Sequence, residues 1–255
     1  MPFFMTNVKR KSIWTNLLVR GSLDLFSRFI GLCMGLNNLH EFGKCLIVYV
    51  DDIVITGNGA KISQLKKYLF SHFQMKDLGS LKYFLVIEVA QLKDKIVISQ
   101  RKYVLGILKE TSMIDYRLVD SPRDPNIKLT SDQGDPYLDL ERYQRLGRKL
   151  IYLTITRPNI SFAIGVVSQF LQAPHTNYHS DLMVHILKYI KKDPGQGLLY
   201  EDKGNTQVTN YCGVDWVESP IDRCFTTWYC IFIGDNIVSW KSKKQIVVAH
   251  SSAEA

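Results

Sequence analysis

Hydrophobic residues along the chain follow two periods, one typical of strands and one typical of helices. Residues 46–50 and 53–56 are short apolar, β-branched runs, and they predict two buried strands joined by a turn that carries two aspartates. The same periods predict helices at 22–36, 61–73, 101–109, 140–154, 159–171 and 179–190, and strands at 82–90, 95–99, 197–200, 207–211, 228–233 and 237–240.

The order of these elements predicts an α+β chain in four parts. Residues 1–43 contain one of the predicted helices, at 22–36, and the basic run at 9–11 favours a solvated start. Residues 44–120 alternate strands and helices. Residues 121–194 begin with a linker rich in Pro, Asp, Gly and Ser and continue as helices, and residues 195–255 contain strands.

Composition narrows the class of protein. Of 255 residues, 46% are hydrophobic, which is enough to bury a core. No apolar run approaches the roughly 20 residues that a membrane span needs, and the N-terminus lacks a secretory signal. The five cysteines form no CxxC pair, which favours reduced thiols and argues against zinc. We therefore expect an intracellular protein with no membrane partner.

The net charge of +8 favours a polyanionic partner, nucleic acid above all. Lys241, Lys243 and Lys244 stand beside Trp240, and aromatic residues next to basic ones are typical of surfaces that bind single strands. A solvated lysine run and a buried Trp240 are the alternative.

Asp51 and Asp52 are the strongest chemical signal in the sequence. Two adjacent carboxylates at a turn repel each other unless a cation lies near them, and oxygen ligands suit Mg²⁺. Nucleotidyl transfer uses two such ions about 3.5–4 Å apart. A solvated Asp-Asp turn is the alternative, and the apolar strands on both sides favour the metal site.

Residues 46–58 (LIVYVDDIVITGN) resemble the active-site hairpin of copia-type reverse transcriptases. Further segments resemble the same retrotransposon Pol polyproteins, in the same order, over about residues 44–255. They are 75–89 (MKDLGSLKYFLVIEV), 98–104 (ISQRKYV), 142–146 (RYQRL), 149–154 (KLIYLT), 156–158 (TRP), 211–216 (YCGVDW), 237–245 (IVSWKSKKQ) and 251–254 (SSAE).

The resemblance implies a fold. Residues 44–120 would be the C-terminal part of a reverse transcriptase palm, and residues 121–194 a linker with helices of the thumb and connection. Residues 195–255 would be a truncated RNase H-like domain. Residues 1–43 would be a degraded N-terminal region, with residues 22–36 as a remnant of a palm helix.

The chain departs from the family where the chemistry needs carboxylates. The family polymerase uses a third aspartate on an upstream strand, yet only Asp24 and Glu41 are acidic before Asp51. In the RNase H part, Gly213 replaces the expected metal-binding aspartate, which leaves Asp215 and Glu254 as remnants. Smaller departures are Val86, where the family tends to have Gly, and Gly147-Arg148, where it tends to have Val-Gly.

The resemblance implies a parent activity of RNA-directed DNA polymerisation with RNase H cleavage, which depends on Mg²⁺ and acts on a nucleic-acid template-primer. Because its carboxylate sets are incomplete, we expect this chain to be inactive as an enzyme. Two alternatives stay open, a non-catalytic nucleic-acid-binding module and a retroelement relic without function.

Overall fold

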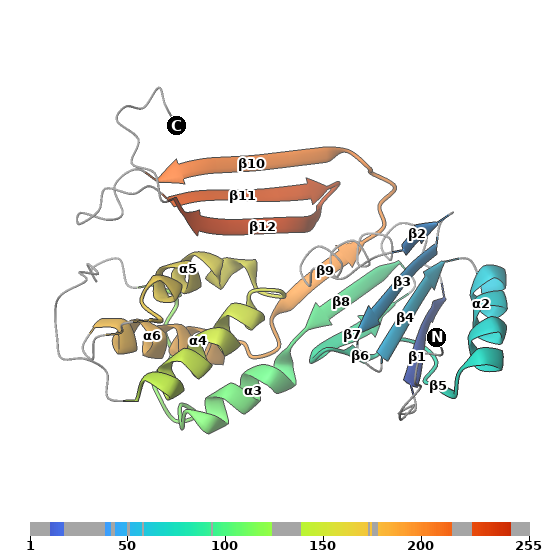
Figure 1. Cartoon of the computed structure of the whole chain (residues 1–255). Coiled ribbons are helices and arrows are strands. Elements are labelled where there is room, and N and C mark those ends of the chain that lie inside the picture. Colours follow the sequence, from blue (N-terminus) through green and yellow to red (C-terminus); the bar gives the residue numbers. More distant parts are fainter. Residues whose placement is uncertain are drawn as a thin grey trace, which may run out of the picture. The chain divides into compact units, whose positions relative to one another are not determined.

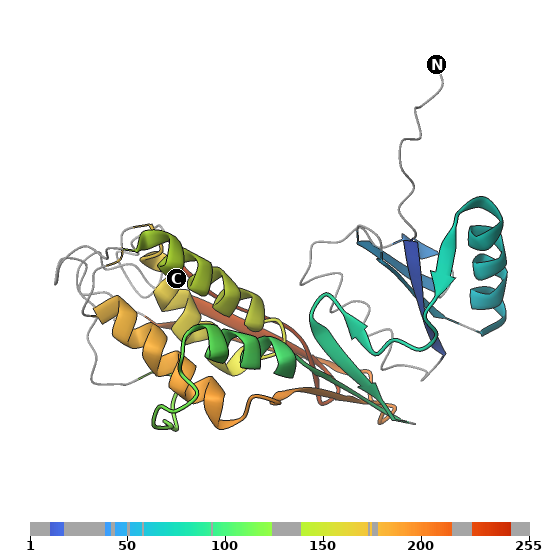
Figure 2. The same ribbon diagram turned by 90° about the horizontal axis from the view of Figure 1, so that it is seen from below.

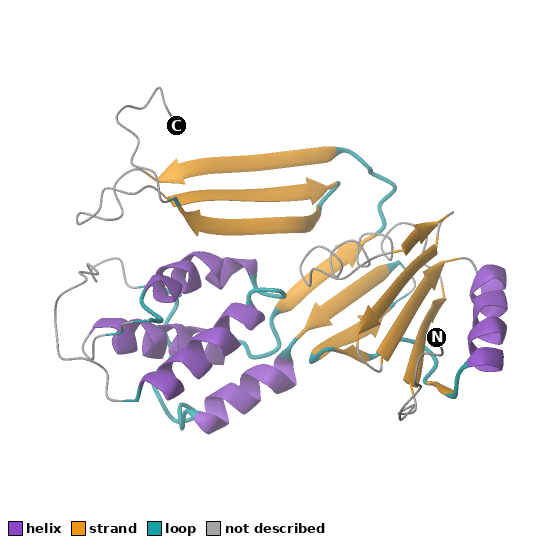
Figure 3. Ribbon diagram, in the orientation of Figure 1, coloured by secondary structure: helices purple, strands orange, loops and turns teal. Residues whose placement is uncertain are grey.

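The computed structural model describes residues 11–17, 39–41, 44–49, 52–57, 59–92, 94–123, 139–172, 174, 178–215 and 226–245. The chain divides into two compact units. The first comprises Met1–Ile98, Leu199–Val208 and Phe232–Ser239, and the second comprises Ser99–Leu198, Thr209–Ile231 and Trp240–Ala255. The described residues form both helices and strands (Figure 3), which is consistent with the α+β class. The four predicted domain boundaries stay a prediction.

A five-stranded sheet in the first unit contains the two predicted apolar strands, β3 (Lys44–Tyr49) and β4 (Asp52–Gly57), as an antiparallel hairpin. Its order is β2-β3-β4-β1-β5, and β1 pairs in parallel with both β4 and β5 (Figure 1). The other strands are β1 (Lys11–Leu17), β2 (Leu39–Glu41) and β5 (Met75–Asp77).

The helix α2 (Gly59–His72) follows β4 and covers this sheet (Figure 2). Ile62 on the helix packs with Ile53 and Ile55 of β4, and all three are buried. Leu65 and Leu69 continue the same helical stripe against that cluster. The hydrophobic period that predicted the helix therefore also identifies its buried face.

The first unit has a second sheet of order β6-β7-β8-β9. Its strands are β6 (Tyr83–Phe84), β7 (Ile87–Gln91), β8 (Lys95–Ser99) and β9 (Gly197–Glu201). The single strand predicted at 82–90 is wrong, because Leu85 and Val86 form a tight turn between β6 and β7. Their φ angles are 49° and 64°, a left-handed conformation that turn residues such as Gly and Asn signal and Leu-Val does not.

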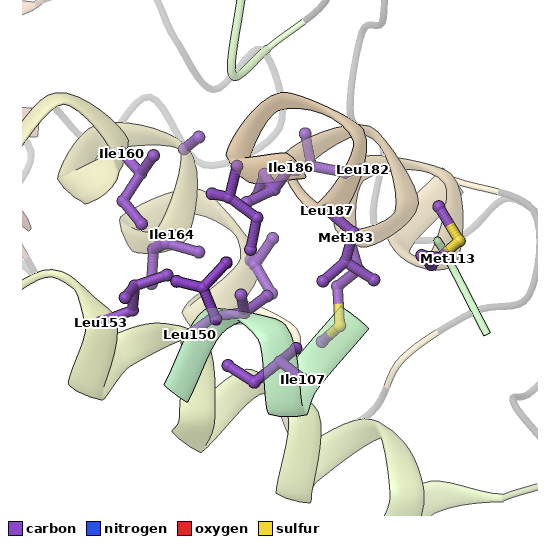
Figure 4. Packing of buried hydrophobic residues seen from close by; sticks show 14 of the residues in the cluster. Ile107, Met113, Leu150, Leu153, Ile160, Ile164, Leu182, Met183, Ile186 and Leu187 are labelled. Carbon is purple, nitrogen blue, oxygen red and sulfur yellow. The ribbon is translucent and has the colours of Figure 1, made fainter. Parts of the chain in front are cut away.

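Helices form the body of the second unit. They are α3 (Arg101–Glu110), α4 (Leu140–Leu153), the short 3₁₀ turn η1 (Pro158–Ile160), α5 (Ser161–Gln169) and α6 (Tyr178–Lys192), close to the predicted spans. Their apolar faces meet in one core. Figure 4 shows side chains from all four α-helices directed into it, among them Ile107, Leu150, Ile164 and Ile186.

A buried polar cluster joins the ends of three of these helices. Thr156 Oγ1, after α4, donates to Gln100 Oε1, before α3, at 2.8 Å. Arg157 is only 1% exposed, and its Nη2 donates to the backbone oxygen of Asp193 after α6. Burial lowers the pKa of the Arg157 guanidinium below its ordinary value. Buried polar groups need such partners, so these bonds fix where the helix ends lie.

A three-stranded sheet of order β10-β11-β12 follows β9. Its strands are β10 (Val208–Asp215), β11 (Thr226–Ile233) and β12 (Asn236–Lys244), each longer than predicted. Gly234 and Asp235 form the tight turn between β11 and β12, and Gly234 has φ of 58°. Glycine adopts that angle without strain.

Three strands were not predicted: β1, β2 and the three-residue β5. β1 includes Lys11, so the basic run expected to be solvated partly enters a sheet. β2 has only three residues. All three have mixed polarity and are defined by pairing with other strands, which periodicity cannot detect. The predicted helix at 22–36 lies outside the described residues. Among the described residues, no helix has the length and hydropathy to cross a bilayer.

Replacing Val86 tests the strained turn. A β-branched residue at φ of 64° is strained, and glycine is not. We expect Val86→Gly to be more stable than Val86→Ala by about 1 kcal/mol, measured as the free energy of unfolding in denaturant. At Ala90, an exposed position of β7 with ordinary φ, Ala→Gly should instead destabilise the protein. A Val86→Ala variant as stable as Val86→Gly would contradict the left-handed conformation assigned to Val86.

Candidate functional site

The aspartate hairpin lies where the sequence predicts it. Tyr49, the last residue of β3, pairs with Asp52, the first residue of β4. Asp52 is the first residue of β4, and its side chain is half-buried. Asp51 lies outside the described residues. The local fold thus places Asp52 at the start of β4, and the metal-binding role of Asp51 and Asp52 stays a prediction.

The strand beside Asp52 determines whether a further carboxylate could bind a metal ion together with Asp52. β1 runs parallel to β4, with Ser12 opposite Asp52 and Ile13 opposite Ile53. The sequence of β1, KSIWTNL, contains no acidic residue. A third carboxylate on this neighbouring strand is therefore absent, and a serine occupies the register position next to Asp52.

Two other acidic residues lie in the same described sheet. Glu41 pairs with Lys44 at the far end of β3, five residues and about 17 Å along the strand from Tyr49. Asp77 pairs with Ile13, which places it two strands from β4, or about 10 Å away. Neither distance suits a site whose ions are roughly 4 Å apart. Asp24 lies outside the described residues.

Asp77 was not singled out by sequence, and it has a structural role. Lys66 Nζ lies 2.6 Å from Asp77 Oδ2, and the backbone N–H of Gly79 donates to Oδ1 at 2.9 Å. The hydrogen bond from Lys66 is the main reason that the pKa of Asp77 is lowered. Asp77 thus ties β5 to α2 and shapes the turn after β5.

The residues present fit Mg²⁺ incompletely. Mg²⁺ is held by one or two carboxylates together with water and substrate phosphates, so Asp51 and Asp52 could hold one ion weakly. The described residues contain no group of three His, Cys, Asp or Glu side chains that could hold a metal. They therefore do not provide a two-ion site.

The second candidate site centres on Gly213 in β10. A Cβ atom at Gly213 would lie 2.6 Å from Cε2 and Cζ2 of Trp228 and 2.8 Å from its Nε1. The indole of Trp228 therefore occupies the space that any side chain at position 213 would need. The side chain of Asp215 and the whole of Glu254 lie outside the described residues, so their role as RNase H remnants stays a prediction.

The three lysines of β12 do not share one face. Trp240 Nε1 donates to the backbone oxygen of Thr154 at 3.1 Å, so Trp240 faces the helices. Side chains alternate along a strand. Lys241 and Lys243, both exposed, therefore point away from Trp240, while Lys244 shares its side and is half-buried. A basic surface can include Lys241 and Lys243 but neither Trp240 nor Lys244.

A double-mutant cycle tests the contact between Gly213 and Trp228. Gly213→Ala should destabilise the chain by about 1–3 kcal/mol, because the new methyl group must displace the indole. In a Trp228→Ala background the same change should be neutral or stabilising, since alanine suits a strand better than glycine. Unfolding in denaturant of the four proteins gives the coupling energy.

Gly106→Ala is the control for that cycle, because a Cβ there meets nothing within 4 Å. It lies inside α3, so this change should stabilise the chain by about 1 kcal/mol. Equal effects of Gly213→Ala in both backgrounds would show that the indole is not the obstacle.

Comparison with known proteins adds a family to this geometry. The sequence pattern of the family described as reverse transcriptase (RNA-dependent DNA polymerase) matches residues 29–125. A retrovirus-related Pol polyprotein from transposon RE1 of Arabidopsis thaliana is 37% identical over 82% of this chain and 14% of its own length. The polyprotein from transposon TNT 1-94 of Nicotiana tabacum is 29% identical over 82% of this chain and 16% of its own.

A shorter relative matches along most of its length. It is an uncharacterized mitochondrial protein of Arabidopsis thaliana, 36% identical over 82% of this chain and 87% of its own. No solved structure matches the chain. Against the RE1 polyprotein, the chain spans 14% of the length. From the hairpin, the reverse transcriptase pattern and these identities, the chain belongs to the family of copia-type, retrovirus-related Pol polyproteins of transposons and carries part of their reverse transcriptase-like domain.

Proposed function

We propose that this chain is a segment of a copia-type reverse transcriptase and RNase H that binds nucleic acid and does not polymerise DNA by itself. The register of β1 against β4 carries this proposal. The strand position next to Asp52 holds Ser12, and the sequence of β1 offers no carboxylate in its place.

The chemistry explains why one missing carboxylate matters. Polymerases of this kind use two Mg²⁺ ions to activate the attacking 3′-hydroxyl and to neutralise charge on the phosphates. Carboxylates on neighbouring strands hold both ions in a fixed geometry. Asp51 and Asp52 alone supply charge without that geometry, so ion affinity and positioning both fall.

The strands β10, β11 and β12 support the second half of the proposal. Three consecutive strands that contain residues 211–215 and 237–244 of the resembling segments suit the start of an RNase H-like sheet. The nuclease would need a carboxylate at position 213, where Trp228 fills the space instead. We therefore propose that hybrid cleavage is lost as well, and that a surface for nucleic acid is what the chain keeps.

Primer extension tests the polymerase half directly. The purified chain, with a poly(rA)/oligo(dT) template-primer and Mg²⁺ or Mn²⁺, should incorporate no more dTTP than a protein-free control. The reason is the incomplete carboxylate set at β4. Incorporation that Asp51→Asn abolishes would overturn the proposal, since it would show that the hairpin is catalytic as it stands.

Adding a carboxylate tests the metal site independently of activity. Ser12→Asp introduces one opposite Asp52, and we expect it to strengthen Mn²⁺ binding by about tenfold, because affinity rises with the charge of the ligands. Asn16→Asp is the matched control, since Asn16 pairs with Thr56, four residues and about 13 Å further along. Water proton relaxation measures the bound Mn²⁺. Equal affinity in both variants would contradict the assigned register.

A further inference from the structure

One face of the β10-β11-β12 sheet combines exposed aromatic rings with lysines. Gly213 and Trp228 lie on it, because the missing Cβ of Gly213 points into the indole. Tyr211 lies two residues before Gly213 on β10 and so faces the same way. Trp228 is 43% exposed and Tyr211 is 55% exposed, so both rings reach solvent.

The lysines Lys241 and Lys243 lie on this face too. β11 ends at Ile233 and β12 begins at Asn236, so a two-residue turn joins them and Ile233 pairs with Asn236. Counting five residues back along β11 and five forward along β12 places Lys241 opposite Trp228. The exposure along β12 alternates in agreement with this pairing. Lys241 and Lys243 are exposed, and Trp240 and Ser242 are half-buried. We call Tyr211, Trp228, Lys241 and Lys243 the aromatic-lysine face.

The absence of a side chain at Gly213 leaves room for the indole of Trp228 against β10. The missing Cβ would be almost equally far from three bonded ring atoms of Trp228, at 2.6, 2.6 and 2.8 Å. A contact with the ring edge would leave Cε2 clearly farther than its two neighbours, so the glycine meets the broad face of the indole. The ring lies against β10 at this corner, and Trp228 remains 43% exposed.

We propose that the aromatic-lysine face binds single-stranded nucleic acid, with bases stacked on Trp228 and Tyr211 and phosphates at Lys241 and Lys243. Every base has a π-face, so stacking on an aromatic ring needs no particular sequence. Bases inside a duplex are already stacked on each other and cannot reach the rings. This inference rests on the proposed function only in taking nucleic acid as the partner.

Charge decides the occupant of the face. The three strands contain three lysines and one acidic residue, Asp215, and two of the lysines belong to the face. A polyanion is complementary to it. A second copy of the chain, paired by a two-fold axis over the same face, would bring Lys241 and Lys243 of each copy close to those of the other.

Binding of the full chain to a fluorescein-labelled oligo(dT) 20-mer tests the proposal by fluorescence anisotropy. Trp228→Ala should weaken binding about tenfold, the loss expected for one stacked base, and Tyr211→Ala should weaken it severalfold. The double change Lys241→Glu and Lys243→Glu should weaken it further and reduce the slope of log affinity against log salt by about 0.7 for each lost phosphate contact.

Matched controls separate the face from general effects. Tyr68→Ala removes a tyrosine of similar exposure, 57%, from α2, and Lys67→Glu changes an exposed charge on the same helix. Both should bind the 20-mer as the unchanged chain does, and circular dichroism checks that each variant is folded. The double lysine variant keeps the test valid if Trp228→Ala fails to fold.

Three results would overturn the proposal. The first is equal loss of binding in Tyr68→Ala and Trp228→Ala. The second is a duplex 20-mer bound as tightly as the single strand. The third is a dimer in sedimentation that Trp228→Ala dissociates without any change in DNA binding. In each of these results the chain still binds nucleic acid, and the primer-extension result stays the same. Failure of this proposal can therefore be told apart from failure of the proposed function.

Discussion

The hydrogen bonding of β4 on both edges is the constraint on which the candidate polymerase site depends. β3 pairs with one edge and β1 with the other, so Asp52 has fixed neighbours on both sides. The β1 edge supplies Ser12 and no acidic residue. Because a paired strand cannot move without breaking its ladder, a carboxylate of another described strand cannot take the place of Ser12. Asp77 is already paired with Lys66, and Glu41 lies at the opposite end of the sheet.

Two glycines show how departures from the family pattern are accommodated by packing. At Gly213 the indole of Trp228 fills the side-chain space, and at Gly147 the side chain of Leu171 does the same inside the helical core. Around Gly147 the interior is close-packed, so Leu171 occupies the volume that a side chain there would take. Gly213 instead lies beside Trp228, which is 43% exposed. Returning either glycine to a larger residue therefore requires the neighbour to change as well. Val86 is the opposite case, because it keeps its side chain at the cost of a strained φ.

The helical unit is held by apolar packing and by a few buried polar bonds of defined geometry. The core side chains of α3, α4, α5 and α6 supply most of the stability. The hydrogen bonds of Gln100, Thr156 and Arg157 fix the positions of the helix ends, because each bond joins ends that are distant in sequence. The segments 98–104 and 156–158, which resemble stations of the family, meet in this cluster. These segments therefore have a structural role that needs no contact with substrate.

The sequence by itself determined the helices, the aspartate hairpin and the family, because each is encoded in neighbouring residues. The helical period of α4 and α6 and the apolar runs around Asp51 and Asp52 needed no long-range information. Only the tertiary structure decided that β1 pairs with β4, that Leu85 and Val86 form a turn, and that Lys244 is separated from Lys241. Pairing between distant strands and the facing of side chains across a sheet depend on contacts between residues far apart in the chain, and local periodicity contains no record of them.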